Sequence, residues 1–297
     1  MNKVLLLSLL ALGYQSASAQ LVTERFGAGD NAFSMEFVTI GNPGNAADTT
    51  GSPNPAGSVA YNYNLSKYEV SREIIEKANR DGGLGLTLAD ISSMGGNGNL
   101  RPASGLSWYE AAKFVNYLNT STGGVAAYKF DSNGNAQLWS VGDSGYNPSN
   151  LFRNSFATYW LPSTDEWYKA AYSSPSGAWS NSLSGRYGLG ISSGPVDITD
   201  AGGQTVWGTI GQGGNVWEWL ESATDGSNNN ITELRDQRGG SWFSQANALN
   251  SSIRVEQNPS VENEYNTGIR IASVPEPSTL SLLALGGLVV AMGRRKK

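Results

Sequence analysis

The chain has 297 residues, 20 of them basic and 25 acidic. Its formal net charge of −5 argues against a nucleic-acid partner, because binding a phosphate backbone requires clustered cations. Cysteine and histidine are both absent, which excludes disulfides, thiolate nucleophiles, imidazole metal ligands and a Ser-His-Asp triad. Any resident metal must therefore be held by oxygen, and acid–base chemistry must use carboxylates, lysine or tyrosine.

Residues 1–19 have the organisation of a secretory signal peptide. Lys3 supplies the positive charge, residues 4–13 form an apolar run, and Ala17-Ser18-Ala19 offers the small side chains that signal peptidase accepts. A buried N-terminal helix is the alternative, but the order of charge, apolar run and small residues is typical of export. We expect this segment to be removed and the folded domain to span residues 20–273.

The first elements of that domain are expected to be two strands, at residues 33–38 and 61–65. The first has Phe, Met and Phe at alternate positions, and the second has Tyr, Tyr and Leu. A period of two is the pattern of a strand with one buried face. A turn-rich segment, residues 41–57, separates them.

Three helices are predicted after these strands. Residues 69–79 have apolar side chains at helical spacing, with Ser71 available as a cap. The other two helices begin at Ser-x-x-Glu capping boxes, Ser107 with Glu110 and Ser163 with Glu166. In such a box the serine accepts from a free backbone N–H and the glutamate reaches back to the cap residue. We therefore interpret both glutamates as caps rather than as catalytic acids.

The second half of the domain is expected to hold long loops and short strands. Residues 123–154 and 173–213 are rich in Gly, Ser and Asn, and loops of this length are usually functional or mobile. Strand character returns at residues 216–220, 240–243 and 268–272. The whole pattern predicts an irregular α+β domain with few helices.

The C-terminal tail has three parts. Pro275, Glu276 and Pro277 interrupt regular structure, residues 279–293 carry no charge, and four basic residues, 294–297, end the chain. A helix of this length spans about 22 Å at 1.5 Å per residue, which is short of the roughly 30 Å hydrocarbon core of a bilayer. The basic end is expected to remain on the cytoplasmic side.

Residues 274–297 resemble the PEP-CTERM sorting signal of Gram-negative bacteria. The resemblance implies that an exosortase-type protease recognises the Pro-Glu-Pro segment and removes the helix, so that the inner membrane holds the protein only transiently. Its destination would be the cell surface, the outer membrane or the extracellular matrix. The alternative is a plain tail anchor that stays in the membrane.

Six segments carry distinctive combinations of glycine, aromatic and charged residues. They are LSKYEVS (65–71), RPASGLSWYEAAKFVNYLN (101–119), YWLPSTDEWYKAAY (159–172), GGNVWEWLES (213–222), RGGSWFSQANALNSSIR (238–254) and NTGIRIAS (266–273). Together they resemble the formylglycine-generating enzyme family, the sulfatase-modifying factors, over nearly the whole mature body. The resemblance implies a decorated C-type-lectin-like fold with little regular secondary structure.

The resemblance also implies a calcium site. Its ligands would be the backbone carbonyls of Gly214 and Val216 and the carboxylate of Glu218, which are oxygen donors of the kind that Ca²⁺ prefers. The chain departs from the family at Gly211, where an asparagine side chain is usual. Calcium binding is thus a hypothesis, which a calcium titration of the domain would test.

Copper is not expected. The family's enzymes oxidise a substrate cysteine to formylglycine with copper held by two cysteines just after the Gly-Gly-Ser segment. The matching positions here are Ser244 and Leu249, and neither a hydroxyl nor an alkyl group replaces a thiolate for Cu(I).

Groove residues of the family have counterparts that are still present. Trp217, Ser241, Arg254 and Asn266 match substrate-contacting positions, and Ser244 lies among them. This polar rim could bind a peptide or a polysaccharide through hydrogen bonds and aromatic stacking. The alternative for Trp217 is core packing, and for Arg254 it is a salt bridge.

The sequence therefore predicts a secreted, exosortase-processed protein with a non-catalytic binding domain. One alternative is an enzyme of altered chemistry that would use carboxylates such as Glu218, Glu221 or Asp225 in a shared cleft. Another is a structural protein of the envelope or matrix without a ligand.

Overall fold

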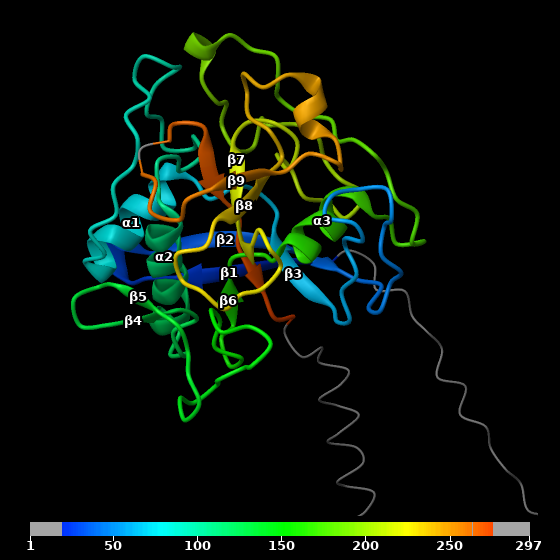
Figure 1. The fold of residues 1–297 in the computed structure, drawn as a ribbon. Helices are drawn as coiled ribbons and strands as arrows, with labels where there is room; N and C mark the ends of the chain where they lie inside the picture. Colours follow the sequence, from blue (N-terminus) through cyan, green and yellow to red (C-terminus); the bar gives the residue numbers. More distant parts are fainter. Residues whose placement is uncertain (1–19, 263, 276–297) are drawn as a thin grey trace, which may run out of the picture.

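The computed structural model describes residues 20–262 and 264–275 (Figure 1). The predicted signal peptide at 1–19, Glu276, Pro277 and the predicted short tail helix lie outside these residues. Helices and short strands are mixed along the described chain, and long loops join them, so the α+β prediction is confirmed.

The first sheet has five strands in the order β1-β2-β3-β11-β6. They are β1 (Leu21–Phe26), β2 (Phe33–Ile40), β3 (Tyr63–Ser66), β11 (Ala272–Ser273) and β6 (Tyr159–Trp160). The pairings are antiparallel. The sequence analysis missed β1, because it is an edge strand whose side chains are mostly exposed or half-buried and carry little hydrophobic pattern. In β3 all four residues are buried, so the strand has two covered faces rather than the single buried face that its alternating aromatic residues suggested.

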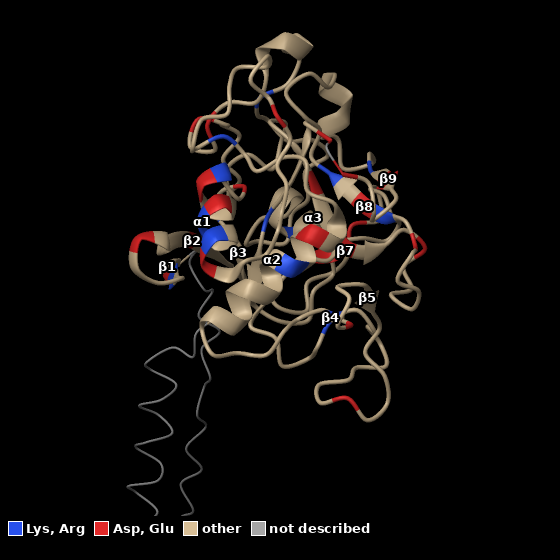
Figure 2. Cartoon of the chain, turned by 90° about the vertical axis from the view of Figure 1, so that its left-hand side faces the viewer, with Lys and Arg blue, Asp and Glu red and all other residues tan. Residues whose placement is uncertain are grey.

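The helices are α1 (Arg72–Gly82), α2 (Trp108–Ser121) and α3 (Thr164–Tyr172). Ser71 caps α1 as predicted, although the helix begins three residues later than the expected start. Both capping boxes are formed, so Glu110 and Glu166 are caps. Charged side chains of both signs lie along α1 (Figure 2).

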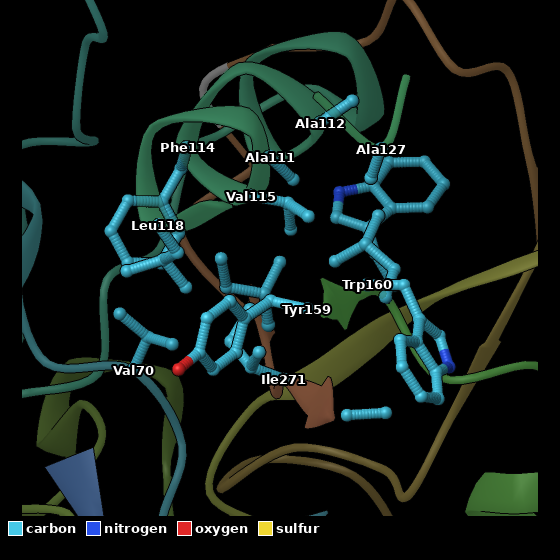
Figure 3. Close-up of a cluster of buried hydrophobic side chains, with 14 of the residues drawn as sticks. Val70, Ala111, Ala112, Phe114, Val115, Leu118, Ala127, Tyr159, Trp160 and Ile271 are labelled. Carbon is cyan, nitrogen blue, oxygen red and sulfur yellow. The ribbon is translucent and has the colours of Figure 1, made fainter. Parts of the chain in front are cut away.

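The main core lies between α2 and the first sheet. Phe114, Val115 and Leu118 of α2 face Tyr159 and Ile271 across it (Figure 3). All five are at least 96% buried. Because α2 buries one continuous apolar face here, it fixes the position of β6 and of Ile271, where the chain passes between the first sheet and the second.

The second sheet has the order β10-β7-β8-β9. Its strands are β10 (Thr267–Ile269), β7 (Trp217–Ala223), β8 (Arg235–Arg238) and β9 (Val255–Gln257). The strand expected at 240–243 is wrong, since these residues form a turn after β8. The strand expected at 268–272 is divided, because the chain leaves the second sheet after Ile269 and joins the first at Ala272.

The long loops contain little regular structure. The segment between α2 and β6 holds only the small hairpin of β4 (Lys129–Phe130) and β5 (Ala136–Gln137), and short 3₁₀ turns occur at Gly29–Asn31, Ile191–Ser193 and Ala246–Leu249. Among residues 20–262 and 264–275, no helix has the length and apolar character needed to cross a bilayer.

Candidate functional site

The Gly239-Gly240 pair turns the chain sharply at the end of β8. Both residues have positive φ values, 100° and 78°. A Cβ atom on Gly239 would lie 2.6 Å from the carbonyl oxygen of Gln212, so only glycine allows this close approach. The Gly214 N–H donates to Gly239 O at 2.8 Å, and Trp242 N–H donates to Asn215 O at 2.9 Å. The turn is thereby fixed against the loop that precedes β7.

Ser241 and Ser244 hydrogen-bond to each other across this turn. Their hydroxyl oxygens lie 3.0 Å apart, and Ser244 Oγ also accepts from the Ser241 N–H at 3.0 Å. The Ser244 N–H in turn donates to Ser241 O at 3.0 Å. Ser241 is fully buried and Ser244 is half-buried. Both hydroxyls therefore maintain the turn.

Leu249 packs beneath the same turn. It is completely buried, and a Cβ atom on Gly240 would meet its Cδ1 at 3.1 Å. Its carbonyl oxygen accepts from Tyr172 Oη at 3.1 Å and from the Leu183 N–H at 3.1 Å. The two positions that match the copper cysteines are thus a hydroxyl within a turn and a core side chain, and this donor set does not fit copper.

Trp217 and Asn266 lie side by side at one end of the second sheet. β7 and β10 run parallel, and the Trp217 N–H donates to Asn266 O at 2.8 Å. Both side chains are half-buried. The structure therefore brings these two predicted groove residues together.

An aromatic trio joins the turn to that end of the sheet. The ring centroids of Trp242 and Phe243 are 5.1 Å apart, and Tyr265 lies 6.0 and 6.1 Å from them. Tyr265 directly precedes Asn266 in the chain, and Trp242 and Phe243 lie between Ser241 and Ser244, so these ring contacts connect the turn to the segment that enters β10. We call Trp217, Asn266 and this trio the Trp217 face.

Arg254 does not belong to the Trp217 face. Its guanidinium contacts Asp236 at 3.2 Å and the carbonyl oxygen of Thr224 at 3.0 Å. Thr224 follows β7 at the opposite end from Trp217. The contacts of Arg254 are those of a salt bridge, the alternative that the sequence left open.

Glu218 is the centre of a buried ionic network. Its carboxylate is fully buried and pairs with Arg270 at 2.9 Å. Trp167 Nε1 donates to the same carboxylate at 2.5 Å. The other guanidinium N–H groups of Arg270 bond to the carbonyls of Ser66, Lys67 and Ile210. Arg270 therefore connects β7 to two further segments, and it lies where the chain crosses between the sheets.

The calcium prediction stays a prediction, and the contacts of Glu218 do not favour it. Its oxygens already accept hydrogen bonds from the Arg270 guanidinium and the Trp167 indole N–H. The negative charge of the carboxylate is therefore largely balanced before any metal ion binds. Between Gly214 and Val216, the Asn215 side chain donates to Glu69 at 2.5 Å, as does the Val216 N–H at 3.2 Å. Among the described residues, no cluster of three acidic side chains suits a metal ion.

Glu69 is a buried carboxyl that sequence analysis did not single out. Burial and the neighbouring Glu218 carboxylate raise the pKa of Glu69 well above its ordinary value of 4.5. Its hydrogen-bond donors are the amides of Asn215 and Val216 rather than a cation. The sequence offered no signal for this, because Glu69 precedes these two donors by 146 and 147 residues.

The carboxylates proposed for an altered chemistry do not converge. Glu221 is fully buried and accepts from Tyr128 Oη at 2.9 Å and Asn150 Nδ2 at 2.6 Å. Burial raises its pKa, although Arg153, 3.5 Å away, opposes the shift. Asp225 is exposed and accepts from a backbone N–H of its own turn. With Glu218 held by Arg270, each of the three carboxylates has separate partners.

The lysine with a lowered pKa, Lys169, does not supply an accessible base either. Lys169 on α3 is fully buried, and burial lowers its pKa to about 8. Its Nζ donates to the carbonyl oxygen of Asn42 at 2.9 Å. This ammonium group holds a loop in place and is closed to solvent.

Residues 32–274 match the family model described as the sulfatase-modifying factor enzyme 1-like domain. The chain belongs to this family. A second match, the PEP-CTERM protein-sorting motif, covers residues 273–297. No curated protein matches the chain significantly. The domain and the motif together support a secreted, exosortase-sorted family member that is exported and transiently anchored, as in Gram-negative bacteria.

Solved structures share the fold of this family member. Treponema denticola variable protein 1 superposes with a TM-score of 0.61 at 20% identity, covering 86% of this chain and 99% of that chain. CarF gives 0.60 at 16% identity, with 82% and 99% covered. PvdO from Pseudomonas aeruginosa gives 0.56 at 17% identity, with 85% and 98% covered. At these identities the likeness concerns the C-type-lectin-like fold alone.

Proposed function

We propose that the domain is a non-catalytic binding module and that the Trp217 face takes a peptide or a glycan. The thiolate positions of the family are filled by Ser244 and Leu249, and both are engaged in holding the turn together. The chain contains no cysteine, so no thiolate is available to hold copper as in the family's enzymes. A polar rim with aromatic side chains remains, and such a rim is suited to recognition.

The indole of Trp217 carries this proposal. Seven of the nine tryptophans donate their indole N–H to an acceptor within the protein, namely Trp108, Trp139, Trp160, Trp167, Trp207, Trp219 and Trp242. Trp217 makes no such bond to another described residue. Its ring is half-buried, so it offers both a stacking surface and a free donor to a ligand.

Titration calorimetry against peptide and oligosaccharide panels tests the proposal. Trp217→Ala is expected to weaken the binding of at least one of the ligands found by tenfold or more, since it removes the ring and the donor together. Trp217→Phe keeps a ring but not the N–H donor, so its affinity is expected to lie between those of wild type and Trp217→Ala. Equal affinity of wild type and Trp217→Ala for every ligand found, at equal melting temperature, would contradict the assignment to this face.

We further propose that tail processing releases the protein from the inner membrane to the cell surface, the outer membrane or the matrix. The PEP-CTERM match supports this route. Fractionation and mass measurement of the expressed chain test it. The mature protein should lack the tail beyond the Pro-Glu-Pro segment, whereas an intact tail in the inner membrane would indicate a plain anchor.

A further inference from the structure

A polar groove lies beside the C-terminal end of α3, away from the Trp217 face. It consists of two adjoining cavities of about 280 Å³ each, which share Ser182 and include no residue of the Trp217 face in their linings. One is bordered by Trp179 and Gln204 and the other by Asn250 and Ser252. Ligand clefts typically measure roughly 300–1,000 Å³, so the two together suit consecutive units of a chain better than one compact molecule. We call this pair of cavities the Trp179 groove.

The lining of the Trp179 groove carries no charged side chain among the described residues. Serine, threonine, asparagine and glutamine make up most of it. Two other cavities differ: the one beside α1 includes Glu36, Glu73 and Lys77, and the one beside α2 includes Lys113. A charged ligand in the Trp179 groove would lose hydration without gaining a counter-charge. The lining therefore selects an uncharged, polar ligand.

Trp179 is held rigidly at the edge of the groove. Its ring centroid lies 5.5 Å from that of Tyr168, and a Cβ atom on Gly57 would lie 2.4 Å from its Cη2. Backbone pairing of Trp179 with Ser173 ties the loop to the end of α3. An aromatic surface fixed in this way loses little conformational entropy when a ligand stacks on it.

Both cavities of the groove are lined by polar groups without a hydrogen-bond partner among the described residues. Trp179 is the second tryptophan whose indole N–H donates to no other described residue. The side chains of Gln204, Ser184, Asn250 and Ser252 likewise make no hydrogen bond to another described residue, and all but Asn250 are exposed. Their donors and acceptors bond to water in the free protein and are open to exchange with ligand hydroxyls.

We propose that the Trp179 groove binds a neutral polysaccharide. A sugar ring has an apolar C–H face that packs on an aromatic ring and a rim of hydroxyls that both donate and accept, and the groove offers partners for each. Sulfated, phosphorylated or uronic polymers would meet no cation there, on a protein that is itself acidic. The site goes beyond the proposed function, because no residue of the Trp217 face lines it.

Calorimetry with the folded domain tests this assignment. The probes are neutral hexasaccharides of glucose, mannose, galactose and xylose, with oligogalacturonate as the anionic comparison. At least one neutral probe is expected to bind and the anionic probe is not. Trp179→Ala should weaken binding tenfold or more, and Trp179→Phe, which keeps a ring without the N–H, should weaken it less.

A surface substitution covers the case in which Trp179→Ala unfolds. Ser182 is exposed and shared by the two cavities, so Ser182→Asp places a charge in the groove and should weaken the neutral probe tenfold. Ser155→Asp adds the same charge at an exposed serine outside the groove and should leave binding unchanged. Failure of all neutral probes to bind, or equal affinity in Ser182→Asp and wild type, would overturn the proposal. Binding lost in Trp217→Ala but retained in both groove variants would assign the glycan to the Trp217 face instead.

Discussion

The stretch from Arg238 to Arg254 passes through two contrasting regions. Its first part is the turn of Gly239–Leu249, where hydroxyls bond to one another and Leu249 is fully buried. Closer to its end, Asn250 and Ser252 line the Trp179 groove, and their side chains make no hydrogen bond to another described residue. The first region is closed by packing and the second is open to solvent. Residues that match a catalytic site in sequence can therefore be closed to a ligand, while their neighbours in the chain are open to one.

Removal of Arg270 should have the largest effect on stability. Arg270→Met leaves the buried Glu218 carboxylate without its cation, so we expect the free energy of unfolding to fall by about 3–5 kcal/mol. Urea denaturation measures this. Lys77→Met, which removes a half-buried i,i+4 pair with Glu73 at the helix surface, is the control and should cost at most about 0.5 kcal/mol. Similar losses in the two variants would show that the buried network does not support the closed region.

Leu249→Ala should come next. It removes a fully buried side chain from beneath the turn, and such truncations cost about 2–5 kcal/mol in unfolding free energy. Ser182→Ala in the groove should stay within about 0.5 kcal/mol of wild type, because Ser182 is exposed. If the two variants were equally stable, the contrast between a closed turn and an open groove would fail.

The pH dependence of stability should reveal Glu69. Its raised pKa means that the folded state keeps a proton that the unfolded state loses above about pH 4.5, so the free energy of unfolding decreases as pH rises through and beyond that value. Glu69→Gln removes this titration. The variant should gain stability over wild type progressively above pH 4.5 and show no gain below it. Parallel stability curves at all pH values would refute the buried, protonated carboxyl.

Calcium should have the smallest effect. Because Glu218 is engaged by Arg270 and Trp167, we expect neither heat in a calcium titration nor a rise in melting temperature. Chelation should be equally without effect. A calcium-dependent rise in melting temperature that disappears in Glu218→Gln would instead establish the site predicted from the family resemblance.

Local signals in the sequence predicted the helices well. Ser107 and Ser163 cap their helices through residues three positions away, so the information lies within one turn. Turn chemistry was harder, since the strand expected at 240–243 is a turn imposed by two glycines with positive φ. Trp242 and Phe243 are aromatic and therefore suggested a strand, but the two glycines before them turn the chain.

Long-range contacts explain what the sequence could not predict. Glu218 and Arg270 are 52 positions apart and meet only because β10 pairs with β7 before the chain changes sheets. The separation of Arg254 from Trp217 likewise depends on which end of β7 its guanidinium reaches. Trp179 lies in a loop with no periodicity, and its unpartnered N–H is visible only when the tertiary contacts of all nine tryptophans are known.

A search for formylglycine tests most directly whether the domain lacks the copper-dependent cysteine oxidation of the family's enzymes. A peptide with a sulfatase cysteine motif is incubated with the purified domain, copper and oxygen, and its mass is measured alongside a sample without protein. We expect an unchanged cysteine in both samples, because the chain has no thiolate to hold copper and Leu249 occupies one of the two ligand positions. An aldehyde product that depends on the protein would contradict it.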